Sequence, residues 1–177
     1  RAGDAIEMAR AAGADDAWAS ASRSNGVEVE VRDGQVEKLQ ESTSRGLSIR
    51  VYVDGRYATY RTSDLRPEPL RAFVRDAVAM TRALEPDPFR EIPDPALYEG
   101  RSDVDLELHD PAVLQLTPDQ RLGWCMEMAE ECARHDRVVS ATVSVSGGHS
   151  LVASASSNGF SGHHERTSHW RDRKSVV

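Results

Sequence analysis

Apolar and polar residues alternate strictly in two stretches near the start of the chain. Valines alternate with charged residues over 27–32, and Leu, Ile and Val alternate with polar residues over 47–53. A period of two is typical of a β-strand with one face on a core and the other in water. Asp33-Gly34 and Asp54-Gly55 directly follow these stretches. Because Asp-Gly pairs adopt the positive φ angles of a tight hairpin turn, the pattern predicts four antiparallel strands, at about residues 26–32, 35–43, 46–53 and 56–62.

A fifth strand is predicted from weaker alternation over residues 17–23. Ser24-Asn25-Gly26 follows it and is a turn signal, which would lead this strand into the meander. Within the meander, Val36 and Leu39 differ in parity, and a bulge near Lys38 would reconcile them.

Apolar residues spaced by three and four predict three helices. The first covers residues 2–12. The second runs from Pro67 to about residue 84, and we expect it to pack across the apolar face of the meander, with its prolines in the first turn. The third starts at a capping box in which Thr117 and Gln120 satisfy each other's backbone groups.

The second part of the chain has a similar order of elements. Alternation over 139–145 predicts a strand, Gly147-Gly148 and Asn158-Gly159 are predicted turns, and a last strand starts near Phe160. Helix, strand, turn, strand, turn and strand therefore repeat, which predicts an internal structural repeat. The expected fold is α+β: an antiparallel β-meander of about five strands packed by helices, followed by a second unit of a helix plus antiparallel strands.

The same patterns predict how the chain is divided. Residues 1–84 form the helix, meander and helix unit, and residues 118–171 form the second unit. Between them, residues 85–117 are a proline-rich acidic arm that we expect to pack along the domain, because it is too apolar for a free tether. Residues 172–177 are predicted to be a non-native tail that is not part of the fold, with a natural basic tail as the alternative.

Composition and charge narrow the function classes. The chain has 22 Lys and Arg against 29 Asp and Glu, and its net charge is −7. Without a dense basic patch before the last residues, direct nucleic-acid binding is not expected. No apolar run has membrane-spanning length, so no membrane partner is expected. Cys125 and Cys132 lie about 10 Å apart along one predicted helix, too far for a disulfide, and reduced core thiols fit a cytoplasmic location.

Candidate metal chemistry is confined to His164-Glu165-x-x-x-His169. Zinc hydrolases place two histidines on one helical face beside a glutamate base. The usual spacing is four, whereas five residues rotate the second side chain by roughly 140° in a helix and point it to the opposite face in a strand. The predicted strand therefore separates His164 from His169, and we assign no catalytic, cofactor or metal residue. A zinc hydrolase using His164, Glu165 and His169 is the alternative, and it needs a third ligand such as His149 or Cys125.

Acidic residues follow one another closely over residues 103–110 of the arm. A calcium loop would need a central glycine and a terminal glutamate, which this stretch lacks. We interpret the stretch as a solvated acidic arm.

Three series of residues carry a resemblance to a known family. They are VRDGQVE at 31–37, SRGLSIRVYVDGR at 44–56 and TSDL at 62–65. Together they resemble the N-terminal domain of the TldD/PmbA family, which is also labelled modulator of DNA gyrase. The resemblance extends from about residue 4 to residue 170, and the aspartate-rich arm is more similar to the PmbA branch, also called TldE, than to the TldD branch.

The resemblance implies a role in proteolysis. TldD members are zinc metallopeptidases that pair with PmbA-like subunits in a cytoplasmic assembly and cut unstructured peptides. Their His-Glu-x-x-x-His motif lies beyond the N-terminal domain, and the PmbA branch lacks those ligands. Here the motif of the same spelling, His164 to His169, falls where the last strand of the N-terminal domain is expected, and Ser168 stands in place of the motif's glycine.

The resemblance therefore implies that residues 1–171 are the N-terminal domain of a PmbA-like partner that has no metal site of its own. Its role would be structural, in the assembly, and zinc would belong to the TldD-type partner. The expected partners are a TldD-like subunit or a second copy, together with a peptide substrate. Besides the zinc hydrolase, a peptide-binding module that adds a peptide strand to an exposed sheet edge remains an alternative.

Overall fold

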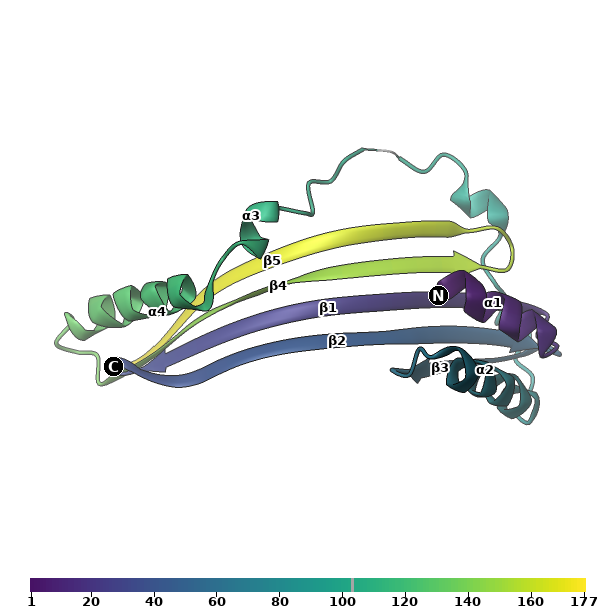
Figure 1. The fold of residues 1–177 in the computed structure, drawn as a ribbon, viewed down its shortest axis with the longest axis horizontal. Helices are drawn as coiled ribbons and strands as arrows, with labels where there is room; N and C mark the ends of the chain where they lie inside the picture. The colour runs from purple at the N-terminus through teal and green to yellow at the C-terminus, as the bar shows by residue number, and fades with distance from the viewer. Residues whose placement is uncertain (103) are drawn as a thin grey trace. The chain divides into compact units, whose positions relative to one another are not determined.

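The fold is a single antiparallel sheet with helices packed against it (Figure 1). The computed structural model describes residues 1–102 and 104–177. Its elements are α1 (Ala2–Ala11), β1 (Asp16–Arg32), β2 (Gln35–Val53), β3 (Arg56–Thr62), α2 (Pro67–Arg82), the 3-10 helix η1 (Pro95–Tyr98), α3 (Pro111–Leu114), α4 (Pro118–Ala133), β4 (Ser140–Ser156) and β5 (Ser161–Val176). The five strands lie in the order β3-β2-β1-β4-β5. The predicted α+β class is confirmed.

The two Asp-Gly corners form as predicted. Asp33 and Gly34 have φ angles of 47° and 77°, and Asp54 and Gly55 have φ angles of 51° and 69°. Two successive positive φ angles are typical of the type I′ turn, whose twist matches that of the flanking strands. The second corner fixes the antiparallel register of β2 and β3, which runs from Val53↔Arg56 to Leu47↔Thr62.

Three predicted strand breaks are wrong. Ser24-Asn25-Gly26 lies inside β1, residues 43–46 lie inside β2, and Gly147-Gly148 lies inside β4. The predicted five-stranded meander is therefore three strands, β1 to β3, and β4 and β5 complete the sheet. Each copy of the predicted repeat consists of a helix followed by a hairpin of two long strands. The two copies are α1-β1-β2 and α4-β4-β5. The repeat thus exists with one turn in each copy instead of two.

Close packing against the neighbouring strands explains the two glycines inside β4, Gly147 and Gly148. A Cβ atom at Gly147 would lie 2.5 Å from the carbonyl oxygen of Ser168 on β5. A Cβ atom at Gly148 would collide with the carbonyl oxygen of Asn25 on β1. Glycine inside a strand often marks such a close approach of two backbones rather than a turn.

The helices begin and end close to the predicted positions. Thr117 Oγ1 accepts a hydrogen bond from the Gln120 backbone N–H at 3.2 Å, and the Thr117 N–H donates to Gln120 Oε1 at 2.9 Å. The predicted capping box of α4 is confirmed.

No helix within residues 1–102 and 104–177 has the length and apolar character needed to cross a membrane.

The chain divides into two compact units. The first consists of Arg1–Arg23, Ser44–Asp105 and Leu151–His164, and the second of Ser24–Thr43, Leu106–Ser150 and Glu165–Val177. Each unit has its own buried cluster of apolar side chains.

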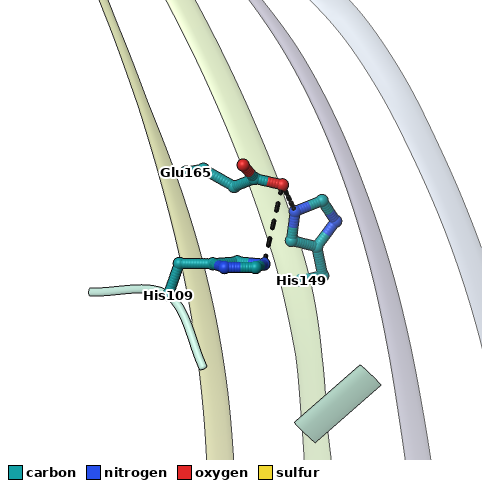
Figure 2. A group of neighbouring side chains, drawn as sticks. All are labelled: His109, His149 and Glu165. Carbon is teal, nitrogen blue, oxygen red and sulfur yellow. Dashed lines mark hydrogen bonds and ion pairs between the residues drawn. The ribbon is translucent and has the colours of Figure 1, made fainter. Parts of the chain in front are cut away.

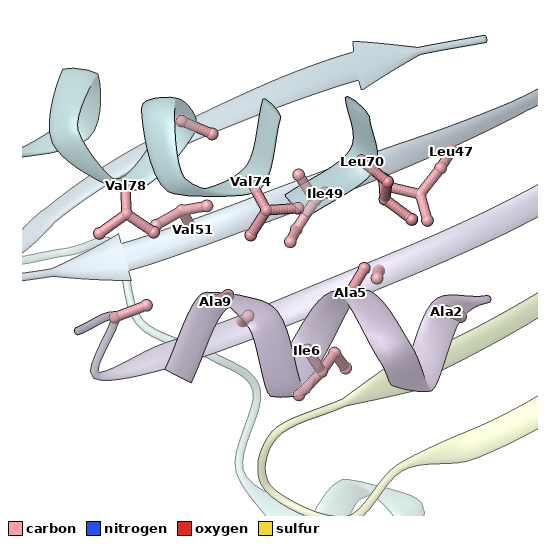
Figure 3. Close-up of a cluster of buried hydrophobic side chains, with 14 of the residues drawn as sticks. Ala2, Ala5, Ile6, Ala9, Leu47, Ile49, Val51, Leu70, Val74 and Val78 are labelled. Carbon is pink, nitrogen blue, oxygen red and sulfur yellow. The ribbon is translucent and has the colours of Figure 1, made fainter. Parts of the chain in front are cut away.

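The first unit buries α1 and α2 against the apolar face of the sheet (Figure 3). The helices contribute one stripe each, and β2 contributes the alternating residues that were predicted to face the core. The cluster includes Ala2, Ala5, Ile6, Ala9, Leu47, Ile49, Val51, Val53, Leu70, Val74, Ala77 and Val78. The prediction that the helix starting at Pro67 covers the apolar face of the strands is therefore confirmed.

The second unit buries α4 against the strands. Its cluster consists of Val29, Val31, Cys125, Ala129, Cys132, Ala141, Val143 and Val145. Both cysteines are buried and unpaired, as their spacing predicted. Burial raises the pKa of the Cys125 thiol, which donates to the Val29 carbonyl oxygen at 3.5 Å. These thiols therefore belong to the core.

The part of the arm up to residue 105 belongs to the first unit and packs within it through aromatic side chains. Trp18 and Phe160 stack with ring centroids 4.7 Å apart, and Tyr98 of η1 meets Phe160 edge-on at 5.1 Å. Arg101 Nη1 donates to the Ser161 carbonyl oxygen at 3.1 Å. Asp103, the first residue of the acidic stretch, lies outside the described residues.

At the other end of the chain, β5 continues to Val176, whose carbonyl oxygen accepts the Val139 N–H at 2.8 Å. Residues 172–176 are therefore part of the strand, contrary to the prediction that they lie outside the fold, and their non-native origin stays a prediction.

Candidate functional site

Two imidazoles and one carboxylate meet in the second unit (Figure 2). They belong to His109, His149 and Glu165, and one ligand atom of each lies within 4.8 Å of the others. Among the residues that the structure describes, this is the one group of three or more His, Cys, Asp or Glu side chains with such geometry.

The sheet positions two of the three side chains. His149 lies on β4 and Glu165 lies on its neighbour β5. A hydrogen bond of 2.5 Å joins His149 Nε2 to Glu165 Oε1. Because the strands fix both backbones, the two side chains meet without help from a loop.

The arm positions His109 through the residues on either side of it. The Thr167 N–H donates to the Leu108 carbonyl oxygen at 2.9 Å, and the Asp110 N–H donates to Thr167 Oγ1 at 2.8 Å. Asp110 Oδ1 also accepts the Ala112 N–H at 2.8 Å and so caps α3. His109 is therefore held beside β5 by bonds before and after it in the sequence.

The three side chains differ in how well their polar atoms are satisfied. His109 Nε2 lies 3.7 Å from Glu165 Oε1, which is too long for a hydrogen bond. This nitrogen is buried and has no hydrogen-bond partner among the described residues. The side chains of His109, His149 and Glu165 are 32%, 23% and 45% exposed, so the group is partly open to solvent although His109 Nε2 itself is not.

This donor set suits a transition-metal ion. Imidazole nitrogens and a carboxylate oxygen are ligands that zinc takes, and a site with three protein ligands keeps a fourth position for water. Glu165 Oε1 lies close to both imidazoles, and only His149 is near enough to hydrogen-bond to it.

The side chains of the His164-Glu165-x-x-x-His169 motif do not come together as the zinc-hydrolase hypothesis requires. β5 covers Ser161–Val176, so the predicted strand is confirmed, and positions five apart along a strand point to opposite faces. His164 is exposed, and His169 lies edge-on to Trp124 with ring centroids 5.4 Å apart. Glu165 joins the group of three, but its companions are His109 and His149.

The sequence suggested part of this group and missed the rest. His149 was named as a possible third ligand, and the structure brings it to Glu165. Cys125, the other suggestion, lies in the core. His109 was missed, because it stands far from both partners in the sequence and nothing in its spacing points to them. Only the hydrogen bonds of Leu108 and Asp110 to Thr167 bring it to β5.

A second polar group lies between α4 and β5 in the same unit. Arg121 is only 2% exposed, and its Nε and Nη1 have no hydrogen-bond partner among the described residues. Burial lowers its pKa. Arg171 lies 3.9 Å above the Trp124 ring and donates from Nε to His169 Nε2 at 3.2 Å. Burial, and then the charges of Arg171 and Arg121, lower the pKa of His169.

The second unit also has an open polar cavity of about 380 Å³. It is lined mainly by serines and glycines of β1, β2, β4 and β5, among them Ser24, Gly26, Ser42, Ser146, Gly148 and Ser168. Serine and glycine carry little apolar surface, so the lining of this cavity is largely polar.

Comparison with known proteins identifies the family. Residues 19–81 match the PmbA/TldA metallopeptidase domain 1, and residues 111–170 match the PmbA/TldA metallopeptidase central domain. Together the two matches cover more than half of the chain. The chain therefore belongs to the PmbA/TldD metallopeptidase family, as the resemblance of its sequence predicted.

Individual relatives agree with this assignment. Metalloprotease PmbA of Escherichia coli O157:H7 is 27% identical over 138 residues, which are 78% of this chain and 30% of that protein. A Bacteroides thetaiotaomicron protein described as a modulator of DNA gyrase has a TM-score of 0.93 at 29% identity, over 99% of this chain and 40% of its own. TldE of Thermococcus kodakarensis, at a TM-score of 0.76 and 15% identity over 98% of this chain and 42% of its own, shares the fold. The chain thus spans well under half of these relatives.

Proposed function

We propose that this chain is the N-terminal part of a PmbA-like subunit, which acts with a TldD-like zinc peptidase in the cytoplasm to cut unstructured peptides. In this role the chain helps to shape the assembly and contributes no catalytic residue. The observation that carries the proposal is the match to two consecutive domains of one metallopeptidase family, at residues 19–81 and 111–170. The likeness to a relative named PmbA supports the choice of branch.

The surface of the arm supports a role in assembly. Phe89 is 92% exposed, Leu97 is 73% exposed and Leu106 is 70% exposed. Large apolar side chains exposed along one segment are typical of a surface that another protein covers. We therefore expect the arm to contribute to the contact with the second subunit.

The test uses the full-length subunit and its TldD-like partner from the same genome, alone and mixed. We expect hydrolysis of an unstructured peptide, such as casein, only when the partner is present, and we expect a chelator to abolish it. Hydrolysis by the full-length PmbA-like subunit alone, lost on His164→Ala or His169→Ala, would instead support the zinc-hydrolase alternative.

A matched pair of variants tests the role of the arm. Phe89→Ser should weaken the association of the two subunits about tenfold or more, since a truncated apolar contact residue of this size is a typical interface hot spot. Val36→Ser, at a residue that is 53% exposed beside the first hairpin turn, should leave the association unchanged. Equal effects of the two variants, measured by analytical ultracentrifugation, would contradict the proposed contact.

The exposed edges of the sheet support the alternative function, a peptide-binding module. β3 and β5 are the outer strands of the sheet, and an outer strand can accept an added peptide strand. Titration of the chain with unstructured peptides, without the partner, separates the two functions. Binding that Phe89→Ser does not change would favour the peptide-binding module.

A further inference from the structure

We propose that His109, His149 and Glu165 bind one divalent transition-metal ion of the zinc class, and that this ion ties the arm to β4 and β5. The site goes beyond the proposed function, in which zinc belongs to the partner subunit. It also differs from the His164-Glu165-x-x-x-His169 motif, with which it shares only Glu165.

The distances between the ligand atoms are close to those that zinc requires. Two atoms bound tetrahedrally at 2.0–2.1 Å from zinc lie about 3.3 Å apart. His109 Nε2 and Glu165 Oε1 lie 3.7 Å apart, and His149 Nε2 and Glu165 Oε1 lie 2.5 Å apart. Both separations differ from this value by less than about 1 Å, and all three ligand atoms lie within 4.8 Å of one another, so binding of one ion would require only a change of side-chain torsions.

The unsatisfied nitrogen of His109 is the second observation. Its Nε2 is buried, points toward Glu165 and has no hydrogen-bond partner among residues 1–102 and 104–177 (Figure 2). A buried polar atom without a partner is rare in a folded protein and often indicates an ion or water. A metal ion held by all three residues would satisfy this nitrogen together with both other ligands.

The ligand types select the class of metal. Calcium and magnesium prefer sites made of oxygen atoms, whereas two imidazoles favour zinc, copper, nickel or iron. The third ligand is a carboxylate rather than a thiolate, because both cysteines of the chain lie in the core. Zinc is therefore the probe that we would use first.

The position of His109 gives the ion a structural role. The residues around His109 are attached to β5 by the two bonds to Thr167, from Leu108 and from Asp110. An ion bound by His109, His149 and Glu165 would add a third attachment, at a residue that lies between Leu108 and Asp110 in the sequence. The ion would then hold this end of the arm to the strands.

The test measures zinc binding to the chain after treatment with a chelator and removal of any affinity tag. Isothermal titration calorimetry should show one zinc ion bound per chain. His109→Ala, His149→Ala and Glu165→Gln should each weaken binding about tenfold or more, the size of effect that loss of even a supporting residue has at metal sites. The double variant His163→Ala and His164→Ala is the matched control, since it removes two exposed imidazoles next to the site and should retain binding.

Hydrogen exchange supplies a readout that does not depend on affinity alone. Zinc should slow exchange of the Asp110 amide, which bonds to Thr167, and should have no such effect in His149→Ala. Circular dichroism checks that each variant is folded. Absence of stoichiometric binding, or binding that is lost in the His163/His164 control and kept in the other three variants, would overturn the proposal. The first outcome would leave His149 and Glu165 as a hydrogen-bonded pair, and the second would show adventitious surface binding.

Failure of the zinc-site proposal can be distinguished from failure of the proposed function in peptide hydrolysis. Zinc binding to this chain is measured without the partner and without a peptide. Peptide hydrolysis by the two-subunit assembly can therefore succeed or fail independently of it.

Discussion

The two compact units use similar elements but differ in what they bury. The apolar cluster of the first unit has 15 buried residues, and that of the second has 8, among the residues that the structure describes. The first unit satisfies both of its buried polar side chains. The Thr81 hydroxyl donates to the Ala77 carbonyl oxygen at 2.8 Å and meets Tyr60 Oη at 3.1 Å, and Ser156 Oγ accepts the Phe160 N–H at 3.0 Å. In the second unit, Arg121 Nε and Nη1 are buried and have no hydrogen-bond partner within the part of the chain that the structure describes.

Buried polar side-chain atoms without a hydrogen-bond partner, among the described residues, all belong to the second unit, whereas shifted pKa values occur in both units: hydrogen bonds with Arg66 lower the pKa of Asp64, in the first unit, to about 2. The His109, His149 and Glu165 group, both cysteines, and the His169 and Arg171 pair all belong to the second unit. The first unit therefore has the larger apolar core, whereas the second unit holds the His109, His149 and Glu165 group and the buried polar atoms that lack a partner among the described residues. Perturbed and unsatisfied groups cluster at functional sites more often than elsewhere.

The largest expected effect compares one leucine from each unit. Leu70 is fully buried in the first unit, and Leu70→Ala should lower the free energy of unfolding by about 2–5 kcal/mol. Leu122 is only partly buried against the smaller cluster, and Leu122→Ala should cost about 1–2 kcal/mol. Chemical denaturation followed by circular dichroism measures both. Equal costs would mean that the two cores do not differ as described.

A pair of glycine variants tests the close approach of strands in the second unit. Gly148→Ala should destabilise the chain by about 1–3 kcal/mol, because its Cβ would collide with the Asn25 carbonyl oxygen. Gly123 lies on the exposed side of α4 with nothing within 4 Å of an added Cβ, so Gly123→Ala should stabilise the chain by about 1 kcal/mol. Thermal unfolding gives both values, and a stable Gly148→Ala would restore the turn that was first predicted there.

Replacing the buried arginine should stabilise the second unit. Arg121→Met keeps most of the side-chain volume and removes unsatisfied donors, and we expect a gain of about 1–3 kcal/mol in the free energy of unfolding. Arg134→Met is the control, since Arg134 is exposed and pairs with Glu131, and its effect should stay within about 0.5 kcal/mol. A clear loss of stability in Arg121→Met would show that the guanidinium has a partner.

The smallest expected effect is a pH dependence that arises at His169. Its pKa is lowered in the folded chain by burial, Arg171 and Arg121, so the folded state favours the neutral imidazole. As the pH falls through about 6.5, the ordinary histidine value, the unfolded chain takes up this proton before the folded chain does, and stability decreases. His169→Gln should remove this part of the pH dependence.

Arg171→Gln should reduce the His169 effect without abolishing it, because burial, the largest cause, remains. Melting temperatures between pH 7.5 and 5.5 measure the change in both variants. An unchanged slope in His169→Gln would assign the pH dependence to other groups.

The sequence predicted the local features of the fold well, and the errors have one cause. Asp33-Gly34 and Asp54-Gly55 form turns because positive φ angles are available to them locally. Gly147-Gly148 has similar turn propensity, but neighbouring strands on both sides keep it extended. Whether a glycine turns the chain or admits a neighbouring backbone depends on that neighbour, which local sequence does not contain.

Taken alone, the sequence determined the α+β class, the helix starts, the two Asp-Gly corners, the alternating core residues and the family. Each of these follows from residues close together in the chain, whose periodicity and turn chemistry act within a few positions. Only the tertiary structure decided that β1, β2 and β4 are continuous and that His109, His149 and Glu165 meet. The reason is that pairing between strands and the attachment of the arm to Thr167 join residues that are far apart in sequence, and spacing carries no record of such contacts.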